Sequence, residues 1–154
     1  TEGCESGWGT DSVCAMAKHW PGGGPCEAGR DAHYAFGKYA VYPGESFEEH
    51  LKPFKDGVFK LDGPTGKVAS IMPYYSVSWN QDCVNGENVG NSYSHYIIND
   101  LLRKKYGYDG VVCTDWGITG DQGTDGIPEQ VEVGTANRVI ADQQEEEIIP
   151  IDIS

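Results

Sequence analysis

Three short apolar stretches recur along the chain, and each ends in polar or aromatic residues. They lie at 12–20, 67–75 and 110–114. Their residues are apolar almost without interruption, which is typical of strands buried on both faces of a parallel sheet. A helix over 12–20 is also compatible with its composition, but Pro21 and the three glycines after it would end that helix at once. We therefore expect three buried strands.

An amphipathic segment separates the first two stretches. Within 46–60, apolar residues recur at helical spacing at Phe47, Leu51 and Phe54. Ser46 and Glu49 have the spacing of a capping box, which indicates that a helix begins there. Pro53 and Gly57 lie inside the segment and weaken the pattern. We expect a helix over 46–60 nonetheless.

The second amphipathic segment, 91–106, has the clearest helical pattern. Asn91 or Ser92 is positioned to cap its start, and Gly107 to close its end. Its last turn is basic, which complements the negative end of a helix dipole. The residues that place the stripe are Tyr93, Tyr96, Ile97, Asp100, Leu101 and Tyr106, and the basic ones are Arg103, Lys104 and Lys105.

Strands and helices therefore alternate along the chain, and the functional groups follow the strands. This order predicts an α/β fold of consecutive β/α units, either part of a barrel or part of a doubly wound sheet. In both folds the site forms at the carboxyl ends of the strands. The loop 21–45 is longer than most connections, which also points to function. No glycine-rich nucleotide-binding motif or P-loop lysine appears.

Composition narrows the classes of ligand. The 154 residues include 24 acidic and 11 basic side chains, for a formal net charge of −13. This charge argues against nucleic acid or an anionic membrane surface as a partner. The sequence has no run of about 18 apolar residues, so we expect no transmembrane helix. The five cysteines are widely spaced and indicate neither a zinc site nor a disulfide framework, so we expect no metal and no cofactor.

Three polar groups follow the three predicted strands. They are Lys18 with His19, the segment 74–79, and Asp115 with Trp116. If the strands are parallel neighbours, these groups meet at one rim, where donors, a carboxylate and a flat indole would suit a neutral polyhydroxy ligand. Simpler interpretations stay open, since an Asp after a strand can cap the next helix and a Lys-His pair is often only a solvated surface. Arg30, Asp31 and His33 by themselves could equally form an ion pair in a loop.

The same residues carry a resemblance to glycoside hydrolase family 3. AMAKHWPGGG (15–24) with RDAH (30–33) resembles a lysine-histidine region of that family, and IMPYYSVSWN (71–80) resembles its next strand end. YDGVVCTDWG (108–117) is similar to the family's nucleophile signature. The three motifs occur in the family's order, and the resemblance extends over about 12–120. The segment 121–154 does not resemble the family.

The resemblance implies a fold and a set of roles. It implies an incomplete barrel of the (β/α)8 type, with about three strands and two helices in 1–120, followed by an acidic tail of unassigned structure in 121–154. It implies that Asp115 is the nucleophile of a retaining β-glucosidase or β-xylosidase. The residues that it implies in sugar binding are Lys18, His19, Arg30, Asp31, His33, Met72, Tyr75 and Trp116.

The resemblance also leaves alternatives open. The family's acid/base is usually a Glu from a second domain, and no Glu here matches it by motif. One branch, the β-N-acetylhexosaminidases, uses an Asp-x-His dyad, which Asp31 and His33 could supply. A non-catalytic carbohydrate-binding or interaction module is a further possibility. We expect the chain to be weakly active or inactive alone, to need missing domains or self-association to complete a barrel, and, from the family, to be secreted or periplasmic.

Overall fold

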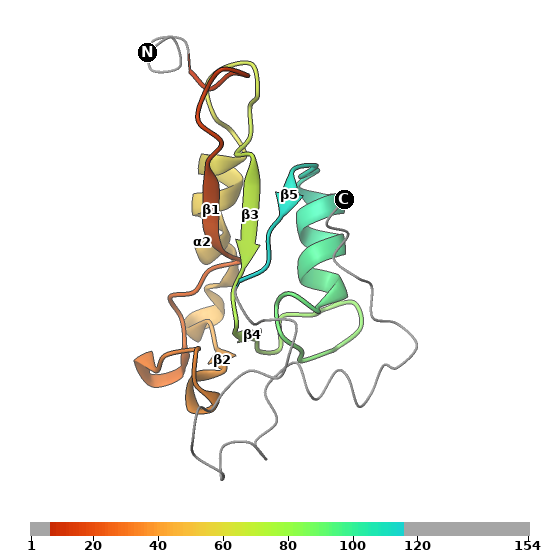
Figure 1. Cartoon of the computed structure of the whole chain (residues 1–154). Coiled ribbons are helices and arrows are strands. Elements are labelled where there is room, and N and C mark those ends of the chain that lie inside the picture. The colour runs from red at the N-terminus through yellow and green to blue at the C-terminus, as the bar shows by residue number, and fades with distance from the viewer. Residues whose placement is uncertain (1–6, 116–154) are drawn as a thin grey trace.

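The three expected strands form one parallel sheet in the computed structural model, which describes residues 7–115 (Figure 1). The strands are β1 (Met16–Trp20), β3 (Ser70–Pro73) and β5 (Val111–Val112), in the order β1-β3-β5. Both neighbouring pairs are parallel. Each strand is shorter than the apolar stretch that predicts it. The sheet confirms the expected α/β class with parallel strands, and a closed barrel is not formed by the described residues.

The register of the sheet separates a covered face from an open one. Ile71 is fully buried, and its partners in register are Ala17 and Val112. The adjacent row contains Met16 and Val111, whose exposed fractions are 42% and 58%. Successive residues of a strand face opposite sides, so one face of the sheet is packed and the other is largely uncovered. The expectation that the strands are buried on both faces is therefore wrong for this row.

The helix expected over 46–60 is present as two continuous segments, α2 (Phe47–Lys52) and η4 (Pro53–Val58). Pro53 has no amide hydrogen to donate, and the helix widens into π-type turns from this residue onward. The predicted capping box is wrong, because the Ser46 side chain makes no cap hydrogen bond. The Ser46 carbonyl accepts from the Glu49 amide instead, and the Glu49 carboxylate pairs with Lys52.

The second helix, η5 (Tyr96–Lys105), begins later than expected. Neither Asn91 nor Ser92 caps it, because the Ser94 hydroxyl accepts a hydrogen bond of 3.2 Å from the Ile97 amide. Its basic last turn is as expected. The guanidinium of Arg103 donates to the carbonyls of Tyr108 and Gly110, at 2.8 and 2.7 Å. This contact fixes the turn that leads from the helix into β5.

The hydrophobic core lies between the covered face of the sheet and the helices. Trp20 is fully buried, packs edge-on against Phe54 with ring centroids 5.1 Å apart, and donates its indole N–H to the Ile97 carbonyl at 3.1 Å. One side chain thus joins β1 to both helices. The other members include Leu51, Phe59, Ile71, Leu101, Leu102, Tyr108 and Val112.

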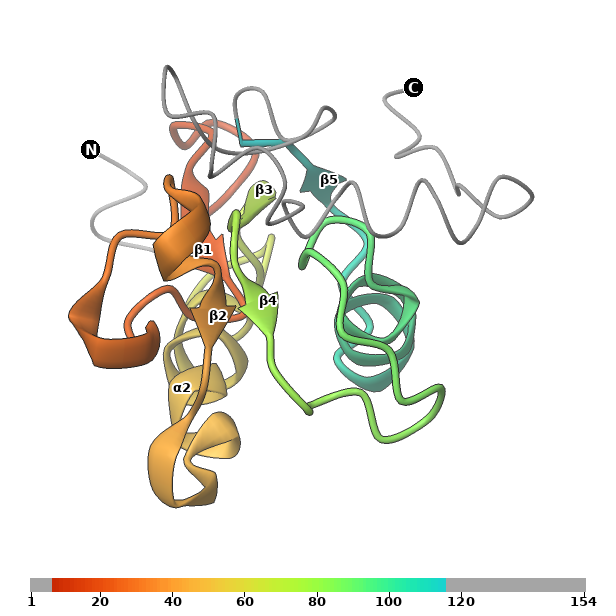
Figure 2. The ribbon, with the colours of Figure 1, turned by 90° about the horizontal axis from the view of Figure 1, so that it is seen from below.

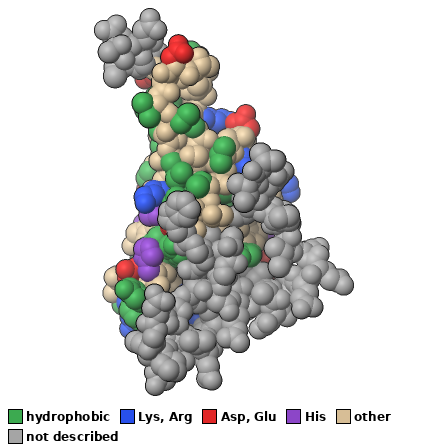
Figure 3. Space-filling view, viewed as in Figure 1, with side chains coloured by type: hydrophobic (Ala, Val, Ile, Leu, Met, Phe, Trp, Pro, Cys, Tyr) green, Lys and Arg blue, Asp and Glu red, His purple; other side chains and the backbone are tan. Residues whose placement is uncertain are grey.

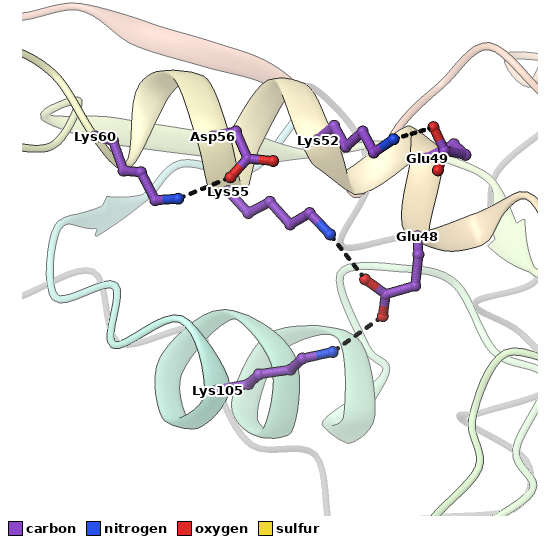
Figure 4. Close-up of polar contacts among 7 residues, drawn as sticks. All are labelled: Glu48, Glu49, Lys52, Lys55, Asp56, Lys60 and Lys105. Carbon is purple, nitrogen blue, oxygen red and sulfur yellow. Dashed lines mark hydrogen bonds and ion pairs between the residues drawn. The ribbon is translucent and has the colours of Figure 1, made fainter.

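An ion-pair cluster connects the two helices at the surface (Figure 4). Glu48 of α2 accepts from Lys55 of η4 at 3.2 Å and from Lys105 of η5 at 3.0 Å. Lys60 pairs with Asp56 a turn away at 2.7 Å. These charges are half-exposed, so they set the alignment of the helices more than they stabilise the fold.

A second small sheet lies beyond the carboxyl ends of the first, below them in Figure 1 and nearer the viewer in Figure 2, and it has no counterpart in the sequence-based prediction. It consists of β2 (Tyr39–Ala40) and β4 (Val77–Ser78), which pair in parallel. A buried polar network supports it, in which Asn91 accepts from Ser78 at 2.7 Å and donates to Ser76 at 3.2 Å. Three single turns of 3-10 helix complete the loop 21–45: η1 (Glu27–Gly29), η2 (Ala35–Gly37) and η3 (Pro43–Glu45).

Among residues 7–115, no helix has the length and apolar character needed to cross a bilayer. Trp116 and the segment 121–154 lie outside the described residues.

Candidate functional site

Two side chains from the two outer strands of the sheet meet at its carboxyl edge. His19 is in β1, and Asp115 follows β5. Nε2 of His19 lies 3.3 Å from Oδ2 of Asp115. The Asp115 side chain is 10% exposed and that of His19 25%, so the pair sits at a sheltered rim that still opens to solvent.

A local irregularity of β1 places His19 at this rim. Lys18 pairs with Met72, and Trp20 pairs with Pro73, so His19 is an extra residue without a partner in the register. Such an irregularity changes the direction in which a side chain points. Trp20 is anchored in the core on the far side of it, and the Trp20 carbonyl accepts from the Tyr74 amide at 3.0 Å.

Aromatic rings from the end of β3 surround the pair. Tyr75 is 8% exposed and shares a side-chain hydrogen bond with Asp115. The ring of Tyr74 lies 4.4 Å from that of His19, measured between centroids. Gly23 approaches the Tyr74 ring so closely that a Cβ there would lie 3.1 Å from it. Tyr74 belongs to the segment 74–79 that the strand pattern places at the rim, but it is not among the residues that the family resemblance implies in sugar binding.

The loop after β1 brings a second histidine to the same rings. His33 lies 4.6 Å from Tyr75 between ring centroids. Its Nδ1 is 2.7 Å from Oδ1 of Asp31, and its amide donates to the same oxygen at 2.9 Å. The amide hydrogen bond, followed by that of the ring, holds the pKa of Asp31 below its usual range. Both side chains are half-exposed, and the contact of His33 with Tyr75 places the Asp31-His33 dyad at the border of the rim.

The other predicted site residues are placed differently. Lys18 is exposed next to His19, and Met72 is buried. Arg30 does not reach the rim by any contact within residues 7–115, since its guanidinium is directed to the Phe36 carbonyl at 3.5 Å. Trp79 packs on Tyr39 in the second sheet, so the segment 74–79 does not act as one group. Trp116 lies outside the described residues.

The electrostatics favour a neutral imidazole. Burial lowers the pKa of His19, and the charges of Lys18 and His33 lower it further, against the opposing attraction of Asp115. Neutral His19 can donate an N–H to Asp115 or to a hydroxyl of a ligand. Burial also raises the pKa of Tyr75, as do the charge and hydrogen bond of Asp115, so Tyr75 keeps its proton. Within residues 7–115, no three His, Cys, Asp or Glu side chains lie close enough together to hold a metal ion.

Comparison with known sequences establishes the family. The sequence model described as the glycosyl hydrolase family 3 N-terminal domain matches residues 4–136, which is most of the chain. The chain belongs to glycosyl hydrolase family 3. This confirms the resemblance found in the three motifs. The match includes the residues of the rim, from Lys18 to Asp115. It also covers 121–136, so the expectation that 121–154 does not resemble the family is wrong for those residues.

Curated relatives within the family are much longer than this chain. A "Beta-glucosidase C" of Emericella nidulans is 44% identical over 113 residues, covering 73% of this chain and 17% of the relative. A "Periplasmic beta-glucosidase/beta-xylosidase" of Dickeya chrysanthemi is 37% identical over 121 residues, covering 76% and 17%. A "Beta-hexosaminidase" of Psychromonas ingrahamii is 30% identical over 110 residues, covering 71% and 29%. The chain thus spans under a third of each of these relatives.

Proposed function

We propose that this chain is the segment of a retaining β-glycoside hydrolase that carries the nucleophile and the first sugar subsite. The supporting observation is the approach of His19, in β1, to Asp115, which follows β5, at 3.3 Å. Its substrate would be a β-linked glucoside or xyloside. The names of the fungal and Dickeya relatives support this substrate class.

In this proposal Asp115 attacks the anomeric carbon and forms a covalent glycosyl-enzyme, which water later hydrolyses. Attack requires an ionised carboxylate, and the hydrogen bond shared with Tyr75 orients it. Lys18 and neutral His19 donate hydrogen bonds to the hydroxyls of the sugar. Met72, which is buried and pairs with Lys18 in the sheet, would line the subsite, and Trp116 would supply a ring against the sugar.

The acid/base is the part of the mechanism that the described residues do not assign. A retaining enzyme places that carboxyl group about 5–5.5 Å from the nucleophile. The Asp31-His33 dyad would serve in a β-N-acetylhexosaminidase-type enzyme, and its geometry is compatible with proton transfer. That alternative is not favoured, because the relatives named β-glucosidases share more identity with this chain than the one named a hexosaminidase.

The small number of strands bears on whether this chain is active alone. A closed barrel surrounds its site with eight strands, whereas the described sheet has three. We expect little or no turnover of an aryl β-glucoside by this chain unless further strands complete the site. Turnover at a rate typical of enzymes would contradict this expectation.

The proposal is tested by covalent labelling with a 2-deoxy-2-fluoro-β-glucoside that carries a dinitrophenolate leaving group, followed by peptide mass mapping. Such a leaving group needs no acid catalyst, so a missing acid/base does not conceal the nucleophile. We expect the label on Asp115 and its loss in Asp115→Asn. Asp109→Asn is the matched control, since the Asp109 side chain is 91% exposed. A folded chain that takes up no label, or is labelled elsewhere, would contradict the proposal.

The variant Asp115→Asn also distinguishes the proposed hydrolase from a non-catalytic carbohydrate-binding module. In that case the wild-type chain would bind glucose without being labelled, and Asp115→Asn would leave binding nearly unchanged.

A further inference from the structure

Two aromatic rings stand exposed on the loop beyond the dyad. Tyr34 and Phe36 stack with centroids 5.3 Å apart and ring planes only 5° from parallel. Each is 49% exposed, and neither ring belongs to the hydrophobic core. Contiguous apolar surface of this kind on a protein commonly marks a binding site. A flat aromatic face fits a partner that is itself flat and apolar on one side.

The loop holds the two rings on a fixed support. The Tyr34 amide donates to the Asp31 carbonyl at 3.2 Å, and the Gly37 amide donates to the Tyr34 carbonyl at 2.9 Å. Arg30 donates to the Phe36 carbonyl. A Cβ on Gly37 would lie 2.0 Å from the Asp31 carbonyl oxygen, so only glycine permits this close approach. A platform that is ordered in advance loses less entropy when a ligand binds.

The platform continues the proposed sugar site. Tyr34 follows His33 in the chain, His33 packs on Tyr75, and Tyr75 shares a hydrogen bond with Asp115. Figure 1 shows the loop that carries the rings, in orange, beyond the carboxyl ends of β1 and β3. The rings therefore extend the site outward from the dyad, away from the sheet. Because Asp115 would attack the anomeric carbon from the side opposite the leaving group, that group would lie on the side of the sugar away from Asp115.

We propose that Tyr34 and Phe36 bind the leaving-side group of the substrate, a second neutral pyranose ring or an aryl group. A pyranose has an apolar face of C–H groups with hydroxyls around its edge. The aromatic pair would contact that face, while the Tyr34 hydroxyl and the half-exposed Asp31 carboxylate can reach edge hydroxyls. The net charge of −13 disfavours an anionic group in the same place. This inference rests on the proposed function.

The test compares binding of glucose and of cellobiose to the chain by NMR titration. We expect cellobiose to shift the ring resonances of Tyr34 and Phe36, and to bind more tightly than glucose. The double variant Tyr34→Ala/Phe36→Ala removes both rings of the stack, which together present one aromatic surface. The Kd for cellobiose should rise roughly fivefold, while the Kd for glucose stays the same. Trp8→Ala is the control, because Trp8 is an exposed aromatic whose backbone contacts the turn at Asp62, at the amino ends of the strands.

Several results would overturn the inference. They are an equal loss for both sugars, no loss for either, no shift at the two rings, or concentration-dependent self-association that the double variant abolishes. Labelling of Asp115 separates the two proposals. If Asp115 is labelled and the rings do not respond to cellobiose, only the inference fails. If the rings respond and Asp115 is not labelled, the assigned nucleophile fails and the aromatic subsite stands.

Discussion

His19 and Asp115 are in contact although neither belongs to the strand between them. His19 is in β1, Asp115 follows β5, and the central strand β3 separates the two. The contact therefore requires both crossover connections and the irregular register of β1 at once. The charge of Asp115 raises the pKa of His19 against the effect of burial, so the pKa of His19 reports on the contact.

The first prediction concerns the pKa of His19, measured by NMR titration of its ring protons. The wild-type value should lie below 6.5 because burial opposes the charged form. Asp115→Asn removes an attraction that raises the pKa of His19 and should lower it further. Lys18→Ala removes a repulsion and should raise it. Shifts in the same direction for both variants would mean that the contact does not exist in solution.

The second prediction follows from the first by linkage. Because the pKa of His19 is lower in the folded chain than in the unfolded one, the unfolded chain binds more protons between the two values. Folding stability should therefore rise with pH from the folded pKa up to about 6.5. His19→Gln should reduce that rise, which urea denaturation at several pH values measures. An identical pH dependence in the variant would contradict the prediction.

The third prediction concerns Asn91, which is fully buried and bonded to Ser76 and Ser78. Asn91→Ala should lower the free energy of unfolding by about 1–3 kcal/mol, because the Ser76 hydroxyl loses the buried amide that donates to it, whereas the Ser78 hydroxyl keeps its hydrogen bond with Tyr42. The segment between β3 and β4 carries Tyr75, so labelling of Asp115 should also slow. The control Asn99→Ala, at a half-exposed position of η5, should change stability by under about 0.5 kcal/mol.

The fourth prediction concerns Glu48 of α2, which pairs with Lys55 of η4 and with Lys105 of η5. The hydrogen bond from Lys105 lowers the pKa of Glu48 more than any other interaction does. Its contribution to stability is thus present above the unfolded pKa of 4.5 and is lost as pH falls through the lower folded value. Since the side chain is half-exposed, Glu48→Gln should cost at most about 1 kcal/mol at neutral pH.

That cost should diminish in high salt, because solvent ions screen exposed pairs. Lys60→Met, which breaks only the pair with Asp56 four residues earlier in the chain, is the comparison. A cost for Glu48→Gln that does not change with salt would indicate packing instead of charge.

Much of the fold follows from local pattern, and the exceptions have tertiary causes. Continuous apolar stretches predicted parallel strands, because such strands contribute Ile71 and Val112 to a core. The paired residues of β2 and β4 are too few to show a period. Asn91 has the residue type of a helix cap, but Ser76 and Ser78 hold its side chain in the core, and Ser94 takes its place.

The site divides in a similar way. His19, Asp115 and Tyr75 come together because parallel strands bring their carboxyl ends to one edge, which residue order alone predicts. Arg30 and Trp79 lie on loops, where side-chain direction depends on contacts with Phe36 and Tyr39 that no local pattern encodes. Their place could be determined only from the structure.

The sheet order has a consequence for how the chain folds. β1 pairs with β3 and β3 with β5, so every ladder joins segments separated by a whole helical connection, such as Met16 with Ser70. Chains dominated by distant pairings fold slowly, because loop closure precedes any gain from contact. The carboxyl edge is then complete only after both ladders have formed. A sugar that binds there would bind only chains in which both ladders have formed. A protease cut in either connection should abolish binding even if the helices stay folded.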